Sequence, residues 1–140
     1  DGMKKMSKSD PSDLSRINLT DEKDEIFNKI KKAKTDPMSM PTDVKGLDKR
    51  PEAENLLGIY SSLRNQKLED SVNEFNRKQF SEFKEKLSEA LIEKIEPISK
   101  EIKKLLNDKR YLDEILLKGS EKADQIASKK IKEIKKLVGF

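Results

Sequence analysis

The sequence contains no cysteine and no histidine. Without cysteine a chain forms neither disulfide bonds nor a thiol nucleophile, and without both residues it lacks the usual zinc ligands and imidazole general bases. Aromatic residues make up only 5% of the sequence, and glycine and proline occur five times each. This composition is unfavourable for a β-sheet sandwich and typical of charged, amphipathic helices.

Long hydrophobic runs are absent as well. No stretch approaches the about 18 consecutive apolar residues of a membrane-spanning helix, and no signal peptide opens the chain. Hydrophobic residues account for 33% of the 140 residues. We therefore expect one small domain with a modest core and no membrane partner.

Charge is abundant but unevenly placed. Charged residues make up 41% of the sequence, and the formal net charge is +4. Residues 97–140 carry 12 basic and 7 acidic side chains, whereas the rest of the chain is nearly balanced. This distribution indicates that the last third faces a polyanion. The alternative is that its lysine-rich helices are simply solvated.

The segment from Ile17 to Pro37 has the signals of a first helix. Thr20 is the expected N-cap, acidic residues fill the first turn, and lysines gather before Pro37. The expected buried stripe consists of Ile26, Phe27, Ile30 and Ala33.

Residues 36–50 show no period and contain proline, aspartate and glycine, so we expect a loop there. Pro51 suits the first turn of a second helix. A short third helix is expected from Leu68 to Phe75, with a break at residues 76–79. The expected inner face of the second helix consists of Ala53, Leu56, Leu57, Tyr60 and Leu63.

The longest apolar pattern crosses Pro97. Because proline lacks an amide donor and crowds the carbonyl of Glu93, we expect a bend there or a tight junction between two helices. Gly119 and Ser120 predict a helix stop and a new N-cap. The shared inner face consists of Leu87, Leu91, Ile95, Ile98, Ile102 and Leu105. The last helix is expected to turn inward Ala123, Ile126, Ala127, Ile131, Ile134 and Leu137.

The only candidate strand is the short piece from Ile17 to Leu19. A chain with one such piece and several helical patterns has to bury its apolar stripes helix against helix. The sequence therefore predicts an all-α fold, a helical bundle.

The string "KMSKS" at Lys5–Ser9 is the most informative short stretch. Two mobile ammonium groups, at Lys5 and Lys8, together with small hydroxyls and backbone amides, suit a polyphosphate better than a core. On composition alone, the alternative is a polar terminus without fixed structure.

This string resembles the second signature of the class I aminoacyl-tRNA synthetases, a loop that closes over ATP during amino-acid activation. Its continuation, "KMSKSDPSDLSRINLTDEKDEIFNKIKKAKTD", is similar to the passage that leaves the catalytic fold in the tryptophanyl and tyrosyl branch. The segments "RPEAENLLGIYSSL" and "GSEKADQIASKKIKEIKKLVGF" resemble bacterial or mitochondrial tryptophanyl-tRNA synthetases. The resemblance covers essentially the whole chain.

The resemblance implies that the chain is the C-terminal part of a longer enzyme. The family's first signature contains histidines, and this sequence has none. Residues 1–20 would be the KMSKS loop and the exit from a missing Rossmann-like catalytic domain, and residues 21–140 a helical anticodon-binding and C-terminal domain. The full-length enzyme would be a homodimer, and this part would be inactive alone and could be monomeric. The implied location is the cytoplasm, with the mitochondrial matrix as the alternative.

In the full-length enzyme the resemblance implies that tryptophan reacts with ATP and its Mg²⁺, that pyrophosphate leaves, and that tryptophan passes to tRNA(Trp). Lys5 and Lys8 would hold the β- and γ-phosphates as the catalytic residues. Met6, through its backbone amide, and Ser7 and Ser9 would donate hydrogen bonds to the nucleotide and to the closed loop.

Asp10 and Asp13 follow this loop closely enough to suggest a Mg²⁺ site. Turn and cap roles are favoured instead, because Asp-Pro and Ser-Asp are common turn sequences. We therefore assign no metal ligand. Gly2 is a candidate hinge.

The candidate tRNA contacts form the only basic cluster interleaved with an aromatic residue. Unpaired anticodon bases are read by stacking and by hydrogen bonds within a basic surface. The alternative for the tyrosine is a core position. The cluster consists of Lys100, Lys103, Lys104, Lys109, Arg110 and Tyr111.

Two other functions stay open at this point. The tyrosyl branch performs nearly the same chemistry on a different amino acid. A stand-alone helical interaction module, whose amphipathic faces bind partner proteins, would have no catalytic role.

Overall fold

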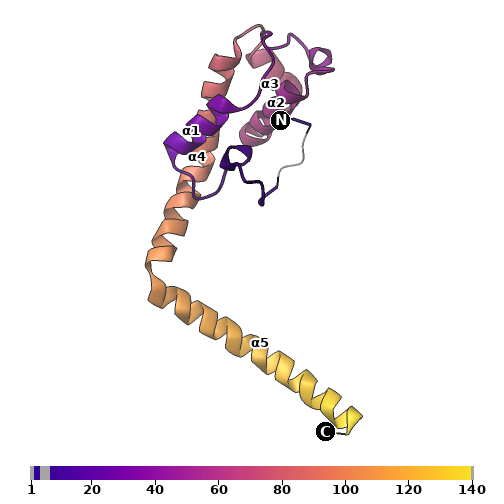
Figure 1. The fold of residues 1–140 in the computed structure, drawn as a ribbon, viewed down its shortest axis with the longest axis vertical. Coiled ribbons are helices and arrows are strands. Elements are labelled where there is room, and N and C mark those ends of the chain that lie inside the picture. Colours follow the sequence, from indigo (N-terminus) through magenta and orange to yellow (C-terminus); the bar gives the residue numbers. More distant parts are fainter. Residues whose placement is uncertain (1, 4–6, 140) are drawn as a thin grey trace. The chain divides into compact units, whose positions relative to one another are not determined.

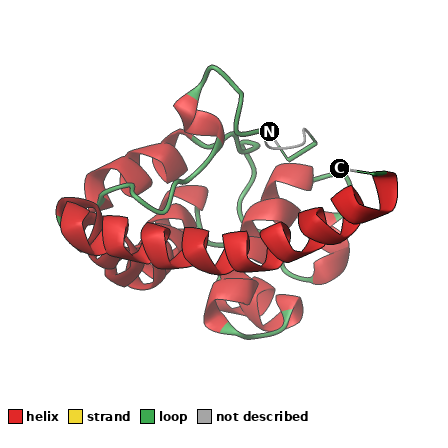
Figure 2. Cartoon of the chain, turned by 90° about the horizontal axis from the view of Figure 1, so that it is seen from below, coloured by secondary structure: helices red, strands yellow, loops and turns green. Residues whose placement is uncertain are grey.

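The computed structural model describes residues 2–3 and 7–139, and in these residues it contains helices and loops but no strand (Figure 2). The all-α prediction is confirmed, and the candidate strand at Ile17–Leu19 is wrong. The chain divides into two compact units, Asp1–Lys100 and Glu101–Phe140. The elements are η1 (Asp13–Ser15), α1 (Lys23–Lys32), η2 (Val44–Leu47), α2 (Pro51–Arg64), α3 (Leu68–Glu74), α4 (Phe80–Asn107) and α5 (Lys109–Val138).

The core of the first unit is built where α1, α2, α3 and the beginning of α4 meet (Figure 1). Its centre is aromatic: the rings of Tyr60, Phe75 and Phe83 meet edge to face, with centroid distances of 4.9 to 6.0 Å. Edge-to-face pairs stabilise a core beyond the area that they bury. The Tyr60 hydroxyl donates to Glu74 over 2.8 Å, which satisfies its polar end.

The prediction for α2 is confirmed, with Leu63 less buried than expected. Pro51 is in its first turn, and four of the five expected inner residues are buried, while Leu63 packs partly buried against the core. The helix ends at Asn65 in the left-handed conformation, with φ of 52°. Asparagine is among the residues that accept this conformation at a helix end.

The start of α1 differs from the prediction. The N-cap is Glu22, not Thr20, and Glu22 and Glu25 form a reciprocal capping box in which Glu25 accepts from the Glu22 amide over 2.8 Å. The physical reason is that Asp21 points into a buried ion pair and leaves the cap to the next residue. Phe27 was expected in the buried stripe but is 41% exposed, whereas Ile26 and Ile30 are buried as expected.

The predicted loop at residues 36–50 is confirmed, with one 3-10 turn inside it. Arg50 closes it by donating to both carboxylate oxygens of Asp36 over 2.7 and 2.8 Å and to the carbonyl of Ser39 over 3.0 Å. Burial alone would raise the pKa of Asp36, but the hydrogen bonds from Arg50 and from the Met38 amide, together with the charge of Arg50, hold that pKa below its ordinary value. The guanidinium also lies over the ring of Phe80.

Lys84 joins α4 to the end of α1. Its Nζ donates to the carbonyls of Ala33 over 2.6 Å and Lys31 over 3.1 Å, which the last turn of α1 leaves without helical partners. Burial lowers the pKa of Lys84. An ammonium at a helix C-terminus also interacts favourably with the helix dipole, so this contact fixes α1 alongside α4 (Figure 1).

The predicted third helix and the break after it are both observed, since α3 ends at Glu74 and α4 begins at Phe80. Pro97 lies inside α4, on the exposed side, and the junction between helices comes only at Asp108. Of the expected shared face, Leu87 and Leu91 are buried and the rest are half-buried, except that Ile98 is exposed.

The predicted break at Gly119 and Ser120 is wrong, because α5 runs through both residues without interruption. A Cβ built at Gly119 meets nothing within 4 Å, so no close approach requires glycine there. The expected inward residues of the last helix are exposed, and no residue of α5 is buried among the described residues of its unit. Of the helices in the described ranges, none is long and apolar enough to cross a bilayer.

Replacing Gly119 by alanine should stabilise α5 by about 1 kcal/mol, because glycine costs about that much relative to alanine in a helix interior. Circular dichroism through a thermal transition measures the change. The same substitution at Gly58, another helical position with free space, should act alike, whereas at Gly139, where φ is +88°, it should not stabilise. Lower helicity for Gly119→Ala would support the predicted break instead.

Candidate functional site

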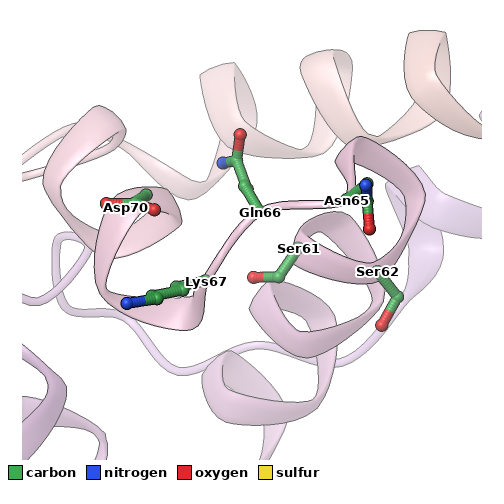
Figure 3. Close-up of a pocket in the computed structure, with 6 residues that line it drawn as sticks. All are labelled: Ser61, Ser62, Asn65, Gln66, Lys67 and Asp70. Carbon is green, nitrogen blue, oxygen red and sulfur yellow. The ribbon is translucent and has the colours of Figure 1, made fainter.

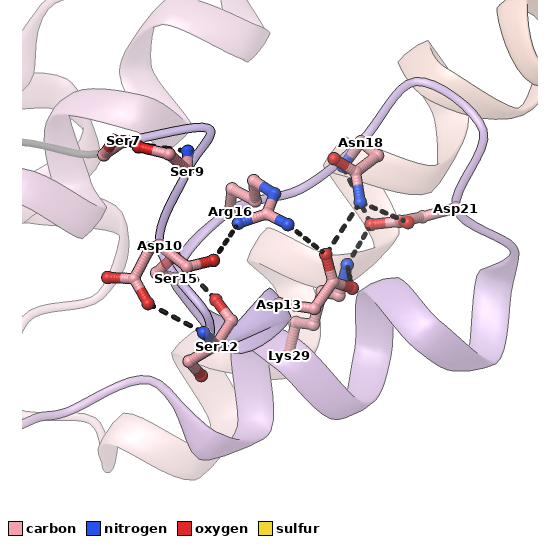
Figure 4. Close-up of polar contacts among 10 residues, drawn as sticks. All are labelled: Ser7, Ser9, Asp10, Ser12, Asp13, Ser15, Arg16, Asn18, Asp21 and Lys29. Carbon is pink, nitrogen blue, oxygen red and sulfur yellow. Dashed lines mark hydrogen bonds and ion pairs between the residues drawn. The ribbon is translucent and has the colours of Figure 1, made fainter.

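The described part of the signature loop is a tight, exposed turn (Figure 4). The hydroxyls of Ser7 and Ser9 are 2.9 Å apart, the amide of Ser9 donates to the Ser7 hydroxyl over 3.3 Å, and the amide of Asp10 donates to the Ser7 carbonyl over 3.3 Å. Lys8 lies at the exposed crest of this turn. The other candidate residues of the loop, Lys5 and Met6, lie outside the described residues.

Asp10 has the turn role that the sequence predicts. Its carboxylate accepts from the amide of Ser12 over 2.8 Å, two residues on, which is an Asx turn. Its carbonyl accepts from Nη1 of Arg16 over 3.0 Å. The end of the loop is therefore held by one contact within the turn, from Ser12, and by one contact from beyond it, from Arg16.

The cap role expected for Asp13 is wrong. Asp13 begins η1, and its carboxylate is used for ion pairs instead: Oδ2 lies 2.6 Å from Nζ of Lys29, and Oδ1 lies 3.2 Å from Nη2 of Arg16. Asn18 also donates to Oδ1 over 3.1 Å. In residues 2–3 and 7–139, no three acidic side chains gather in a way that could hold a metal ion.

Lys29 is the centre of this network. Its side chain is only 7% exposed, and its Nζ lies 2.6 Å from Asp13 and 2.6 Å from Asp21, whose side chain is 6% exposed. Asn18 closes the far side by donating to both oxygens of Asp21 over 2.8 and 3.1 Å. The network thus ties α1 to the segment that follows the loop (Figure 4).

The ionisation of these groups follows from their contacts. Burial alone would raise the pKa of Asp21, but hydrogen bonds from Lys29 and Asn18 outweigh it and hold that pKa below its ordinary value of 3.8. Burial would likewise lower the pKa of Lys29, and its hydrogen bonds to the two carboxylates reverse this and raise that pKa. The hydrogen bond from Lys29 lowers the pKa of Asp13. The three groups therefore stay charged together at neutral pH.

The sequence analysis missed this network. Lys29 belongs to a lysine-rich run that is typical of an exposed helix end. Composition alone does not show that Lys29 is buried while Lys31 and Lys32 are exposed. Its position in the helical repeat could have revealed it. Lys29 lies three residues after Ile26 and next to Ile30, on the buried face of α1. A lysine on the buried face of a helix requires a carboxylate partner, because an unpaired buried charge is unfavourable.

Gly2 lies against the first turn of α2. A Cβ built there would come within 2.5 Å of the Pro51 carbonyl oxygen and 2.7 Å of its carbonyl carbon. A side chain would therefore force the backbones apart, and glycine is required by close approach. Its role as a hinge stays a prediction.

The candidate tRNA contacts lie on both sides of the division between the two units. In the first unit, Lys100 pairs with Glu96 over 2.7 Å. In the second, Lys104 pairs with Glu101 over 3.3 Å and Arg110 with Glu114 over 3.4 Å, all on exposed surface, and Lys109 is exposed while Lys103 is half-buried. Tyr111 is exposed, so its alternative as a core residue is wrong.

A polar depression lies where α2 meets α3 (Figure 3). Its groups already bond one another: the hydroxyl of Ser61 lies 2.7 Å from that of Ser71, and Gln66 donates to Ser71 over 2.9 Å. None of the candidate site residues lines it. It is lined by Ser61, Ser62, Asn65, Gln66, Lys67 and Asp70.

Replacing Lys29 by methionine should destabilise the fold by about 3 kcal/mol, because breaking a buried ion pair leaves an uncompensated charge. In the parent chain the carboxylates contribute stability above their ordinary pKa of 3.8, and it is lost as the pH falls through their lowered folded pKa values. Without the ammonium, burial raises the pKa of Asp21, so this carboxylate becomes protonated, and neutral, as the pH falls. The difference in the free energy of unfolding between the parent and the variant should therefore become smaller in acid.

Urea unfolding across an acidic pH series measures this difference. Lys86→Met is the matched control, because Lys86 pairs with Glu89 on exposed surface and should contribute little. A loss for Lys29→Met that matched the control, or that stayed constant into acid, would contradict the assignment.

Comparison with known proteins agrees with the resemblance noted in the sequence. A family model described as tRNA synthetases class I (W and Y) matches residues 1–96. Proteins named tryptophan–tRNA ligase from Agrobacterium fabrum, Mesorhizobium japonicum and Rickettsia felis are 51%, 50% and 51% identical over all 140 residues. The chain spans 40%, 39% and 42% of the length of these relatives. The chain belongs to the class I tRNA synthetases of the tryptophan and tyrosine group.

Proposed function

We propose that this chain is part of a tryptophan–tRNA ligase, which activates tryptophan with ATP to tryptophanyl-adenylate and transfers it to tRNA(Trp). The observation that carries the proposal is the identity of about half of all positions to relatives of that name, without a gap in coverage of this chain. The same names favour tryptophan over tyrosine as the substrate, and a ligase over a non-catalytic interaction module.

In this proposal the loop at Lys5–Ser9 binds the pyrophosphate part of ATP. Lys8 fits the role because it is exposed at the crest of the turn, and the described part of the chain offers its ammonium no carboxylate. The hydroxyls of Ser7 and Ser9 lie beside it and can donate to phosphate oxygens. Lys5 and the amide of Met6 complete the proposed contacts.

The activation step suits a site without cysteine or histidine. The carboxylate of tryptophan attacks the α-phosphate itself, the bond from that phosphorus to the bridging oxygen breaks, and pyrophosphate leaves with the electron pair. The protein has only to position the reactants and to compensate the charge that develops on the leaving group. Two lysines supply that compensation. Mg²⁺ would arrive with the nucleotide, and no residue of this chain is assigned to it.

We also propose a division of labour along the chain. Residues 1–20 serve the catalytic site, and residues 21–140 serve tRNA(Trp). For the tRNA contacts, Lys100, Lys103, Lys104, Lys109, Arg110 and Tyr111 are the candidates. Their positions on exposed or half-buried surface are compatible with contacts to phosphates, and Tyr111 is free to stack on a base. The bacterial relatives favour the cytoplasm as the location, and a homodimer of the full-length enzyme is part of the proposal.

Lys8→Ala in the full-length enzyme should cost about 3 kcal/mol of transition-state stabilisation, which is typical for one preorganised donor. Tryptophan-dependent pyrophosphate exchange measures the loss, which should appear in turnover while the KM for tryptophan stays unchanged. Lys45→Ala, at an exposed lysine of η2, is the matched control and should leave exchange intact. A defect confined to tryptophan binding would contradict the role, and exchange driven by tyrosine would contradict the substrate.

Charge reversal of Lys103 and Lys104 together should weaken the binding of tRNA(Trp) and flatten its dependence on salt, because fewer counterions are released. Binding measured over a series of salt concentrations gives the slope. Reversal of Lys86 and Lys94, which changes the charge of α4 equally at positions outside the candidate set, is the control. An unchanged slope would exclude Lys103 and Lys104 as phosphate contacts.

A further inference from the structure

We propose that Arg16 is a positioning residue for the signature loop: it holds the Asp10–Pro11 peptide in place and thereby fixes where Lys8 stands. This inference rests on the proposed function of the loop. It concerns a residue that lies outside the "KMSKS" string and has no assigned role in the reaction.

Asp10 is held at three points. Its amide donates to the Ser7 carbonyl over 3.3 Å, its carboxylate accepts from the Ser12 amide over 2.8 Å, and its carbonyl accepts from Nη1 of Arg16 over 3.0 Å. Of these three contacts, only the last comes from beyond residue 12. The first two set the shape of the turn, and the third sets its orientation on the rest of the fold.

Arg16 can do this because its guanidinium presents separate nitrogens in a rigid plane. Nη1 bonds the Asp10 carbonyl, while Nη2 lies 3.2 Å from the carboxylate of Asp13. Asp13 is in turn fixed by Lys29 over 2.6 Å, and Lys29 by the buried Asp21. Each member of this series is held by a second contact, so the position of the Asp10 carbonyl is tied to α1 (Figure 4).

Pro11 extends the effect toward the loop. The proline ring fixes its own φ and biases the residue before it toward extended backbone. With the carbonyl of Asp10 held by Arg16 and Asp10 itself biased toward extended backbone, few free backbone rotations separate that carbonyl from Lys8. Displacing a charge-compensating group by about 1 Å can cost up to a hundredfold in rate. Loss of the Arg16 contact should therefore lower turnover without touching any site for tryptophan.

The test is Arg16→Ala in the full-length enzyme, measured by tryptophan-dependent pyrophosphate exchange below the unfolding transition. We expect kcat to fall by about tenfold with the KM for tryptophan unchanged, since the variant disturbs an interaction of the transition state. Arg64→Ala is the matched control: Arg64, in the last turn of α2, pairs with Glu93 over 2.7 Å, and exchange should be unchanged.

A double-mutant cycle with Lys8→Ala separates positioning from general loss of stability. If Arg16 acts through the loop, its removal should cost little once Lys8 is already alanine, so the two losses should not multiply. A kcat that is unchanged in Arg16→Ala, or losses that multiply independently, would overturn the inference. If Lys8→Ala alone has no effect on exchange, the proposed function of the loop fails, which is a separate outcome.

Discussion

The buried ammonium of Lys29 is the interaction on which the amino-terminal part of the structure depends. A lysine that is almost fully removed from water has to be paired, and Asp13 and Asp21 provide that pairing at 2.6 Å each. The two acids lie on either side of Asn18 in the sequence, so pairing both with one cation bends this segment around the side of α1. The path of the chain between the signature loop and the first helix is fixed by these charges together with Ile17, which packs partly buried against the core.

This constraint explains where α1 begins. Helices prefer a short polar side chain at the N-cap, and the sequence offers several candidates in a row. Asp21 is one of them, but its carboxylate is needed by Lys29. The helix therefore begins one residue later, with Glu22 and Glu25 capping each other. A tertiary contact has overridden the local preference, at no loss of a capping interaction.

α1 makes contacts both with the hydrophobic core and with the segment that follows the loop. Ile26 and Ile30 belong to the hydrophobic core, whose centre is aromatic, while Lys29, between them in the sequence, holds the segment that leaves the loop. At its end, α1 is fixed to α4 by Lys84. The loop is thus connected through a short series of polar contacts to the hydrophobic core of the first unit. For the proposed function this connection matters, because charge compensation is effective only from a fixed position.

The sequence predicts a helix well where apolar spacing and proline agree, as in α2. It predicts poorly where a glycine alone suggests a helix end, since α5 continues through Gly119. Apolar spacing predicts which residues share a face of a helix, but that face can be exposed, as it is in α5. The candidate loop could be found from its string of residues, but Arg16 and Lys29 could not, because ion pairs between segments leave no periodic signal. Lys8 and Lys29 are the same residue type within a short distance in the sequence. Their surroundings differ: Lys29 is buried between the carboxylates of Asp13 and Asp21, whereas Lys8 is exposed.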